Sequence, residues 1–192
     1  MAAPKRAFIW MVRHGQAEGN PVHMLNGNRI DAPLTDKGRA QARAMAKRWR
    51  WKPDAIVTSP LTRAVATAWA LADRFNMKLD FCKMAEEQDY GDFSGRSLDE
   101  VMADPAQQAC FHRDKAGGQI YTIRTPGGET WEDVKKRAAK LLKWADTKYA
   151  GMRIVVVSHS DFINIAYGVR FGLSDEEVFK RQDVPNCKAV RL

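Results

Sequence analysis

Two histidines and two arginines in this 192-residue sequence stand where predicted strands end and helices begin. Arg13 and His14 come directly after one short apolar run, and His159 comes directly after another. Arg63 falls in the first turn of a predicted helix that follows a third run. Because open α/β sheets build their sites at the carboxyl ends of strands, we expect these four side chains to converge. Guanidinium and imidazole groups beside a helix N-terminus form an anion pocket that suits a tetrahedral phosphate.

The elements that must position these side chains follow an alternating order. Short β-rich runs alternate with helical patterns, which is typical of an α/β fold with a mostly parallel sheet. We therefore predict a three-layer α/β sandwich with a mostly parallel central sheet and helices on both faces. The predicted strands are Phe8–Val12, Asp54–Thr58, Leu79–Cys82, Arg153–Val157 and Cys187–Leu192.

The predicted helices and loops complete a single domain over residues 1–192. Apolar residues recur with helical spacing in residues 36–50 and 131–145, so each stretch should pack one face on the sheet. Gly15–Leu34 and Gly117–Gly128 lack periodicity, and we predict loop elaborations at about 16–31 and 96–128 that help to form the site. Two capping boxes, the pattern that opens a helix, are also predicted: Ser97 with Glu100, and Ser174 with Glu177.

Composition excludes several classes of protein. Hydrophobic residues make up 45% of the chain and charged residues 28%, which indicates a globular rather than a disordered protein. The longest apolar run, Ala7–Val12, is far shorter than the roughly 20 residues of a membrane-spanning helix and is also too short for a secretory signal. We therefore expect a cytoplasmic protein with no membrane partner. The three cysteines form no close pair, so we expect free thiols rather than disulfides.

A basic stripe in residues 37–52 contributes much of the net charge of +8. Such a stripe could attract nucleic acid or other anions. A helix face exposed to solvent gives the same pattern. We favour the solvated face, because no nucleic-acid motif accompanies the stripe. The basic residues are Lys37, Arg39, Arg43, Lys47, Arg48, Arg50 and Lys52.

Several segments in order along the chain resemble the histidine phosphatase superfamily, also called the phosphoglycerate mutase-like family. The resemblance covers nearly the whole chain, from about Phe8 to the last predicted strand. The matching segments are Arg13-His14-Gly15 with Asn20, Pro33-Leu34-Thr35 with Gly38, Ser59-Pro60-Leu61 with Arg63-Ala64, Glu87 with Tyr90-Gly91 and Gly95, Pro126-Gly127-Gly128-Glu129, and Val157-Ser158-His159.

The resemblance implies that His14 is a nucleophile that becomes a phosphohistidine. To attack, its imidazole must be neutral, with one ring nitrogen held by a carbonyl and the other aimed at phosphorus. Arg13 and Arg63 would lower the pKa of His14 while binding the phosphate oxygens. His159, hydrogen-bonded to a phosphate oxygen, would stabilise the transferring group if it is protonated in the complex. We expect no metal and no cofactor, because these cations can stabilise the charge.

The leaving group needs a proton, and the family pattern assigns this role to Glu87. The same residue would then act as base for the hydrolytic water. The neighbouring carboxylates Glu86 and Asp89 are alternatives, although an acidic loop is usually exposed to solvent.

A second set of residues should bind the substrate. The resemblance has Asn20 donating to the phosphate and Gly27 allowing close backbone approach. Tyr90 follows Glu87 in the family pattern and belongs to the same set. Asn26 departs from the serine or threonine that is usual at its position. Ser160 departs from the usual glycine, and a serine could narrow the pocket or change the local turn.

The surroundings of the predicted site favour a phosphatase. Gln88 replaces an arginine that mutases of this type use, and the segment after Gly95 has little room for their basic insertion. No C-terminal tail follows the last predicted strand to shield a phosphohistidine from water. We therefore predict a metal-independent phosphomonoesterase that acts on small phosphorylated metabolites. The alternatives are a cofactor-dependent phosphoglycerate mutase, a protein phosphohistidine phosphatase and a non-catalytic RNA or protein binder. The sequence carries no signal of oligomeric state.

Overall fold

A five-stranded sheet lies at the centre of the computed structural model, which describes residues 5–113 and 120–192. Its strand order is β3-β2-β6-β1-β7. Four strands are parallel and β7 is antiparallel to β1, so the prediction of a mostly parallel sheet is confirmed. The strands are β1 (Phe8–Arg13), β2 (Ala55–Thr58), β3 (Leu79–Phe81), β6 (Arg153–Ser158) and β7 (Ala189–Arg191).

The register of β1 and β6 brings the two predicted histidines to one edge. Arg13 pairs with Ser158 at the carboxyl ends of these parallel neighbours, so His14 and His159 leave adjacent strand ends. Every residue of β6 after Arg153 is buried. A continuous apolar run is typical of a strand that is covered on both faces.

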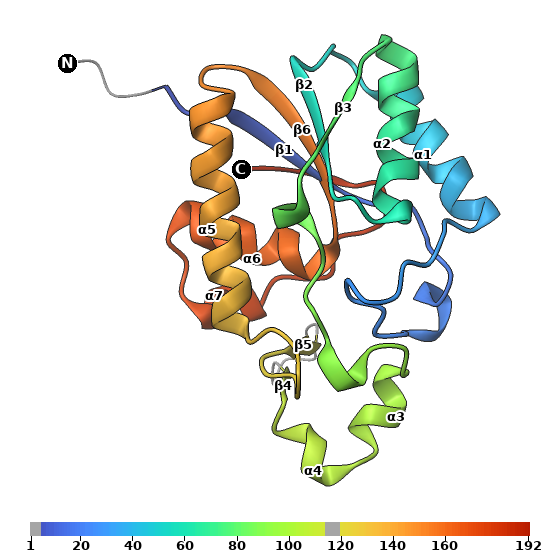
Figure 1. Cartoon of the computed structure of the whole chain (residues 1–192), viewed down its shortest axis with the longest axis vertical. Helices are drawn as coiled ribbons and strands as arrows, with labels where there is room; N and C mark the ends of the chain where they lie inside the picture. Colours follow the sequence, from blue (N-terminus) through green and yellow to red (C-terminus); the bar gives the residue numbers. More distant parts are fainter. Residues whose placement is uncertain (1–4, 114–119) are drawn as a thin grey trace.

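Helices cover both faces of the sheet, as predicted (Figure 1). The hydroxyl of Thr35 accepts from the Gly38 N–H and caps the start of α1. The helix predicted at 131–145 runs three residues further, to Lys148. On one face lie α1 (Asp36–Arg48) and α2 (Thr62–Phe75), and on the other lie α5 (Trp131–Lys148) and α6 (Ser160–Phe171).

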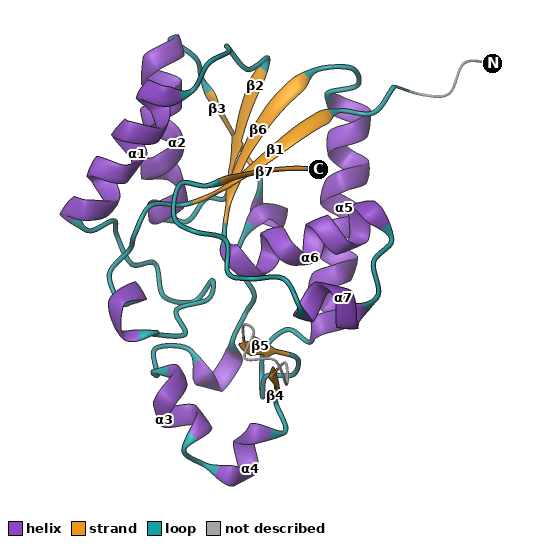
Figure 2. Ribbon diagram, turned by 180° about the vertical axis from the view of Figure 1, so that it is seen from behind, coloured by secondary structure: helices purple, strands orange, loops and turns teal. Residues whose placement is uncertain are grey.

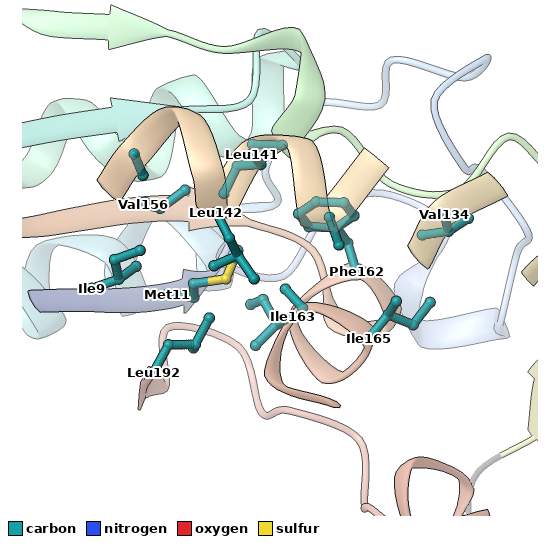
Figure 3. Close-up of a cluster of buried hydrophobic side chains, with 14 of the residues drawn as sticks. Ile9, Met11, Val134, Leu141, Leu142, Val156, Phe162, Ile163, Ile165 and Leu192 are labelled. Atoms are coloured by element: carbon teal, nitrogen blue, oxygen red, sulfur yellow. The ribbon is translucent and has the colours of Figure 1, made fainter. Parts of the chain in front are cut away.

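Alternate residues of β1 enter different hydrophobic cores. Ile9 and Met11 pack with α5 and α6, and Figure 3 shows them beside Leu142 and Ile163. Val12 packs with α1 and α2 on the opposite face. Side chains of successive strand residues point to opposite faces, so a strand between two helical layers must be apolar at every position. These two cores hold the strand ends that carry the site.

A small lobe lies beyond the carboxyl edge of the sheet (Figure 2). The elaborated segment predicted at 96–128 holds the short helix expected after Ser97, a second short helix and an antiparallel pair of strands. Each of these elements has at most five residues, too few to show a period. Residues 114–119 of that predicted loop lie outside the described residues. The lobe consists of α3 (Leu98–Met102), α4 (Pro105–Gln108), β4 (Phe111–Arg113) and β5 (Ile120–Thr122).

Short helical elements occur in the remaining connections. The capping boxes of Ser97 and Ser174 are both confirmed, and they open α3 and α7. The predicted loop 16–31 contains one turn of 3-10 helix. These elements are α7 (Asp175–Phe179) and the 3-10 turns η1 (Asn20–Val22), η2 (Lys83–Ala85) and η3 (Gly91–Phe93).

Two expectations from the sequence, one about the basic stripe and one about the cysteines, agree with the structure. All seven side chains of the basic stripe are exposed, along and just after α1, as expected for a solvated helix face. The three cysteines are free thiols. In the part of the chain that the structure describes, no helix combines the length and the apolar character needed to cross a membrane.

Candidate active site

The imidazole of His14 is held in one tautomer. Its Nδ1 lies 2.6 Å from the Gly15 carbonyl oxygen. Because a carbonyl oxygen only accepts, Nδ1 carries the proton and the Nε2 lone pair is left for attack on phosphorus. The His14 backbone N–H donates to Ser158 at 3.0 Å, and its carbonyl accepts from the Asn186 side chain at 2.9 Å. The backbone of His14 is therefore held by β6 and by the segment before β7.

The same ring is electrically neutral in the folded protein. Burial lowers the pKa of His14 well below its usual value, and the charges of Arg63 and Arg13 lower it further. The side chain is only 4% exposed. The direction of this pKa shift agrees with the expectation from the sequence.

Tight packing of the loop after β1 explains its glycine. The Gly15 N–H donates to the Thr67 hydroxyl of α2 at 2.9 Å. A Cβ on Gly15 would lie 2.5 Å from the Gly38 carbonyl oxygen, which is closer than real Cβ contacts come. Glycine at both positions therefore lets the start of α1 approach the nucleophile's loop.

His159 lies beside His14 and is fully buried, with 5.1 Å between the ring centroids. Its Nε2 is 3.0 Å from the hydroxyl of Ser59. That hydroxyl oxygen accepts from the Leu61 N–H at 3.3 Å, so its proton is available for Nε2. With the hydroxyl donating to Nε2, the proton of a neutral His159 sits on Nδ1, which has no hydrogen-bond partner among the described residues. A buried donor without a partner indicates a position kept for a ligand.

His159 is not an imidazolium in the protein without substrate. Burial lowers the pKa of His159 well below its usual value, and the nearby Arg63 lowers it further. The free protein therefore holds this ring neutral. A neutral ring still offers the Nδ1 proton to a phosphate oxygen, so the predicted hydrogen bond does not need a charged imidazole.

The two arginines are anchored by backbone carbonyls. Arg63 donates to Gly27 at 2.6 Å and to Ile30 at 3.1 Å. Arg13 donates to the Val184 carbonyl at 2.7 Å and pairs with Asp183. Each guanidinium group carries five donors, so these contacts fix its orientation and leave other N–H groups for phosphate oxygens.

Glu87 is held against the N-terminus of α6. One oxygen of its carboxyl group accepts from the Phe162 N–H at 3.2 Å and from the Gln88 N–H at 3.1 Å. Burial raises the pKa of Glu87, which favours the protonated form that a general acid needs. Neither of the alternatives lines the cavity described below, and Asp89 pairs with Arg29 instead.

The segment that carries Glu87 is attached to α5 by one arginine. Arg137 donates to the carbonyls of Met84, Glu86 and Glu87 at 2.7–3.2 Å. It also makes a bidentate ion pair with Glu129, whose carboxylate accepts from the Asp89 N–H. A partly buried, bidentate arginine therefore positions the proton donor from outside the cavity wall.

A cavity of about 550 Å³ opens at this edge of the sheet. The structure brings nine of the ten predicted site residues to its wall, and the tenth, His159, lies behind His14. The nine residues are Arg13, His14, Asn20, Asn26, Gly27, Arg63, Glu87, Tyr90 and Ser160.

Several predicted substrate-binding residues hold the wall together. The side-chain oxygen of Asn20 accepts from the Ala17 N–H at 2.9 Å, and Asn26 donates to the Glu18 carbonyl at 3.0 Å. Both therefore brace the loop after β1. Gly27 has a φ of +53°, and a Cβ there would lie 2.5 Å from the Gln88 carbonyl oxygen. The packing of its loop therefore also requires glycine at this position.

The departure from glycine at Ser160 also has a structural reason. Its hydroxyl donates to Asp183 and accepts from the Val184 N–H at 3.1 Å. Ser160 therefore attaches the segment before β7 to the start of α6. Asp183 in turn holds Arg13, so the serine supports the anion pocket indirectly.

Sequence reasoning missed several residues at this site. Asp161 and Asp183 line the cavity, Ser59 fixes the tautomer of His159, and Arg137 positions Glu87. Ser59 stood in a matching segment but was given no role. The two aspartates had no motif, and only the fold shows that the segment before β7 passes the strand ends.

Comparison with known proteins agrees with this geometry. The family model of the histidine phosphatase superfamily, branch 1, matches residues 9–192. A 2,3-bisphosphoglycerate-dependent phosphoglycerate mutase of Methylobacterium radiotolerans is 32% identical over 89% of this chain and 82% of its own. Phosphoserine phosphatase 1 of Hydrogenobacter thermophilus is 29% identical over 85% and 75%. The solved structure of a mycobacterial glucosyl-3-phosphoglycerate phosphatase, in complex with VO3, has a TM-score of 0.83 and 26% identity, covering 97% of this chain and 92% of its own.

The chain belongs to the histidine phosphatase superfamily, branch 1. It is an enzyme of the phosphatase type, within a family whose named relatives include both phosphatases and mutases.

Proposed function

We propose that the protein is a phosphomonoesterase that hydrolyses small phosphorylated metabolites through a phosphohistidine at His14, without a metal. The observation that carries the proposal is the hydrogen bond from Nδ1 to the Gly15 carbonyl, which leaves the Nε2 lone pair available. Arg13 and Arg63 line the same cavity and supply the positive charge that a transferring phosphoryl group requires.

In the first step, the Nε2 lone pair of His14 forms a bond to phosphorus while the bond from phosphorus to the ester oxygen breaks. Glu87 gives its proton to that oxygen, and the alcohol leaves. The buried Nδ1 proton of His159 donates to a phosphoryl oxygen. Because Arg13 and Arg63 are already anchored, they stabilise the negative charge of the phosphoryl group without reorganising.

In the second step, water attacks phosphorus and the bond to Nε2 breaks. The ionised Glu87 takes a proton from that water, so the carboxyl group and the imidazole both return to their starting states. Inorganic phosphate is the second product. The step needs only water and the side chains already present.

Gln88 supports a phosphatase rather than a mutase. This residue stands where mutases use an arginine, and its amide donates to the carbonyls of Thr122 and Glu129 at 3.0–3.1 Å. It is 1% exposed and does not line the cavity. Gln88 therefore offers no contact to a carboxylate or to a second phosphate. Phosphoglycerate mutase stays the second candidate, because a relative of that name covers most of the chain.

Rapid quenching during turnover tests the proposal. The protein is mixed with a ³²P-labelled ester and quenched in alkali, in which phosphohistidine survives. We expect label on His14 that acid removes. A parallel assay follows phosphate release and the interconversion of 2- and 3-phosphoglycerate after priming with 2,3-bisphosphoglycerate. Phosphate release should dominate. Sustained interconversion without phosphate release would establish the mutase, and absence of label would overturn the covalent mechanism.

A further inference from the structure

We propose that the preferred substrates are phosphate monoesters of short alcohols that carry an ammonium group, and that Asp161 sets this preference. This inference rests on the proposed function, because it identifies the alcohol that leaves when His14 takes the phosphoryl group. The residues that support it lie on the part of the cavity wall that the phosphoryl group does not contact.

The charges of the cavity wall favour a substrate with no second anion. Arg13 and Arg63 are the only arginine or lysine side chains among the described lining residues. A phosphate monoester dianion balances their two charges. Asp183 lines the wall as the partner of Arg13, and Asp161 and Glu87 add two further carboxyl groups. A carboxylate or second phosphate on the alcohol would lie beside these carboxyl groups and find no further arginine or lysine among the described lining residues.

The end of the cavity that receives phosphate is marked independently by His159. Its Nδ1 is buried and has no partner in the described part of the chain, beside the ring of the nucleophile. A phosphoryl oxygen satisfies this donor. The alcohol must then extend past Glu87, because that residue protonates the leaving oxygen.

Asp161 lies next to this path. It is the second residue of α6, and the following residue, Phe162, donates its N–H to the Glu87 carboxylate. The Tyr90 hydroxyl donates to Asp161 at 2.9 Å, which holds the carboxyl group at the cavity wall. An ammonium group two carbons beyond the ester oxygen can therefore approach Asp161 while Glu87 contacts that oxygen.

Four apolar side chains also line the wall, beside the polar His23 and Gln182, and they suit a short carbon chain. Hydrocarbon side chains accommodate methylene groups and give no hydrogen bonds to a row of hydroxyls. These side chains are Met24, Leu25, Leu98 and Ile120.

The preference should depend on pH. The titratable and charged groups that act on Asp161 are Glu87, Tyr90, Asp183, Arg13 and Tyr121. Burial and the charge of Glu87 raise the pKa of Asp161 to about 8, so the empty cavity holds this group protonated near neutral pH. Discrimination in favour of an ammonium group should therefore increase as the pH rises through 8 and Asp161 ionises.

Three esters of matched length test the proposal: O-phosphoethanolamine, propyl phosphate and 2-phosphoglycolate. They end in an ammonium, a methyl and a carboxylate group. We expect kcat/KM to fall in that order, with at least about a tenfold difference between the first and the last at pH 8. Equal values, or a preference for 2-phosphoglycolate, would overturn the proposal. Failure to hydrolyse all three esters and p-nitrophenyl phosphate would instead overturn the proposed function.

The variant Asp161→Asn tests the residue itself, because asparagine still accepts from the Tyr90 hydroxyl but carries no charge. It should reduce the ratio between the ammonium and carboxylate esters to within about threefold and abolish its pH dependence. The control Asp92→Asn removes an exposed carboxylate outside the cavity wall and should keep the ratio. An unchanged ratio in Asp161→Asn would remove Asp161 from this role. The wild-type series and its pH profile decide the substrate class even without a folded variant.

Discussion

The two ends of the cavity are built in different ways. The phosphoryl end uses His14 and His159, which leave adjacent strands in fixed parallel register between two hydrophobic cores. The leaving-group end uses Tyr90 and Asp183, which come from connections distant in sequence, and Asp161, the second residue of α6. Its geometry depends on side-chain hydrogen bonds between loops. The comparison shows that chemistry common to many substrates is positioned by the sheet, whereas selection among substrates is left to the connections.

The largest expected effect tests the phosphoryl end. His14→Ala removes the nucleophile, so kcat should fall by roughly four orders of magnitude or more on every ester. Steady-state phosphate release from an activated and an unactivated ester measures the loss. His112→Gln also removes an imidazole, from a residue outside the cavity wall, and should keep normal turnover. Substantial activity in His14→Ala would show that another group receives the phosphoryl group.

The variant Glu87→Gln distinguishes phosphoryl transfer to His14 from proton donation to the leaving group. The amide oxygen can still accept from the Phe162 and Gln88 N–H groups, but the side chain has no proton to give. The rate should fall about 10²-fold to 10³-fold on alkyl phosphates and far less on p-nitrophenyl phosphate, whose leaving group needs no proton. Glu86→Gln is the matched control, because Glu86 does not line the cavity. Equal losses on both esters would exclude Glu87 as the general acid.

The phosphoryl end could be predicted from the sequence because its signals are local. Arg13, His14 and His159 follow apolar runs whose strands are buried on both faces, and Arg63 opens a helix after another strand. The class of fold, all five strands of the central sheet and the two capping boxes were predicted for the same reason. Each depends on a short run of residues rather than on contacts between distant segments.

Two residues of the leaving-group end, Asp161 and Asp183, could not be predicted, because their place at the cavity depends on tertiary contacts. The segment before β7 reaches the cavity only when β7 pairs with β1, and that pairing places Asp183 against Arg13. The packing of Gly27 was not predicted for a similar reason. Its loop packs on Gln88, which is 61 positions away, and no sequence period records such a contact. The contact between His159 and Ser59, from a different strand end, is likewise a tertiary contact.

The variant Ser59→Ala tests the phosphoryl end through the hydrogen bond to His159. Without the hydroxyl, Nε2 of His159 loses its donor, and the proton is no longer confined to Nδ1. We expect kcat to fall about tenfold, the equivalent of one hydrogen bond, equally on activated and unactivated esters. Ser94→Ala, which removes a buried hydroxyl without a partner in the described residues, serves as the control. A loss confined to esters of poor leaving groups would place the effect on proton transfer instead.

The smallest effect concerns the stability of the leaving-group end. The folded protein keeps Asp161 protonated up to a pKa of about 8, whereas an unfolded aspartate ionises near pH 4. Between these values the folded state binds the additional proton, so this group's contribution to the free energy of unfolding falls as pH rises. Asp161→Asn cannot titrate and escapes that loss. The Tm of the variant relative to wild type should therefore be higher at pH 8 than at pH 5.

The lowered pKa values of His14 and His159 act in the opposite direction, but they are common to both proteins and cancel in the difference. Thermal unfolding at the two pH values measures this difference, and Asp92→Asn, at an exposed position, should show no such trend. A Tm difference that does not change with pH would mean that Asp161 ionises in the folded protein as it does in the unfolded chain.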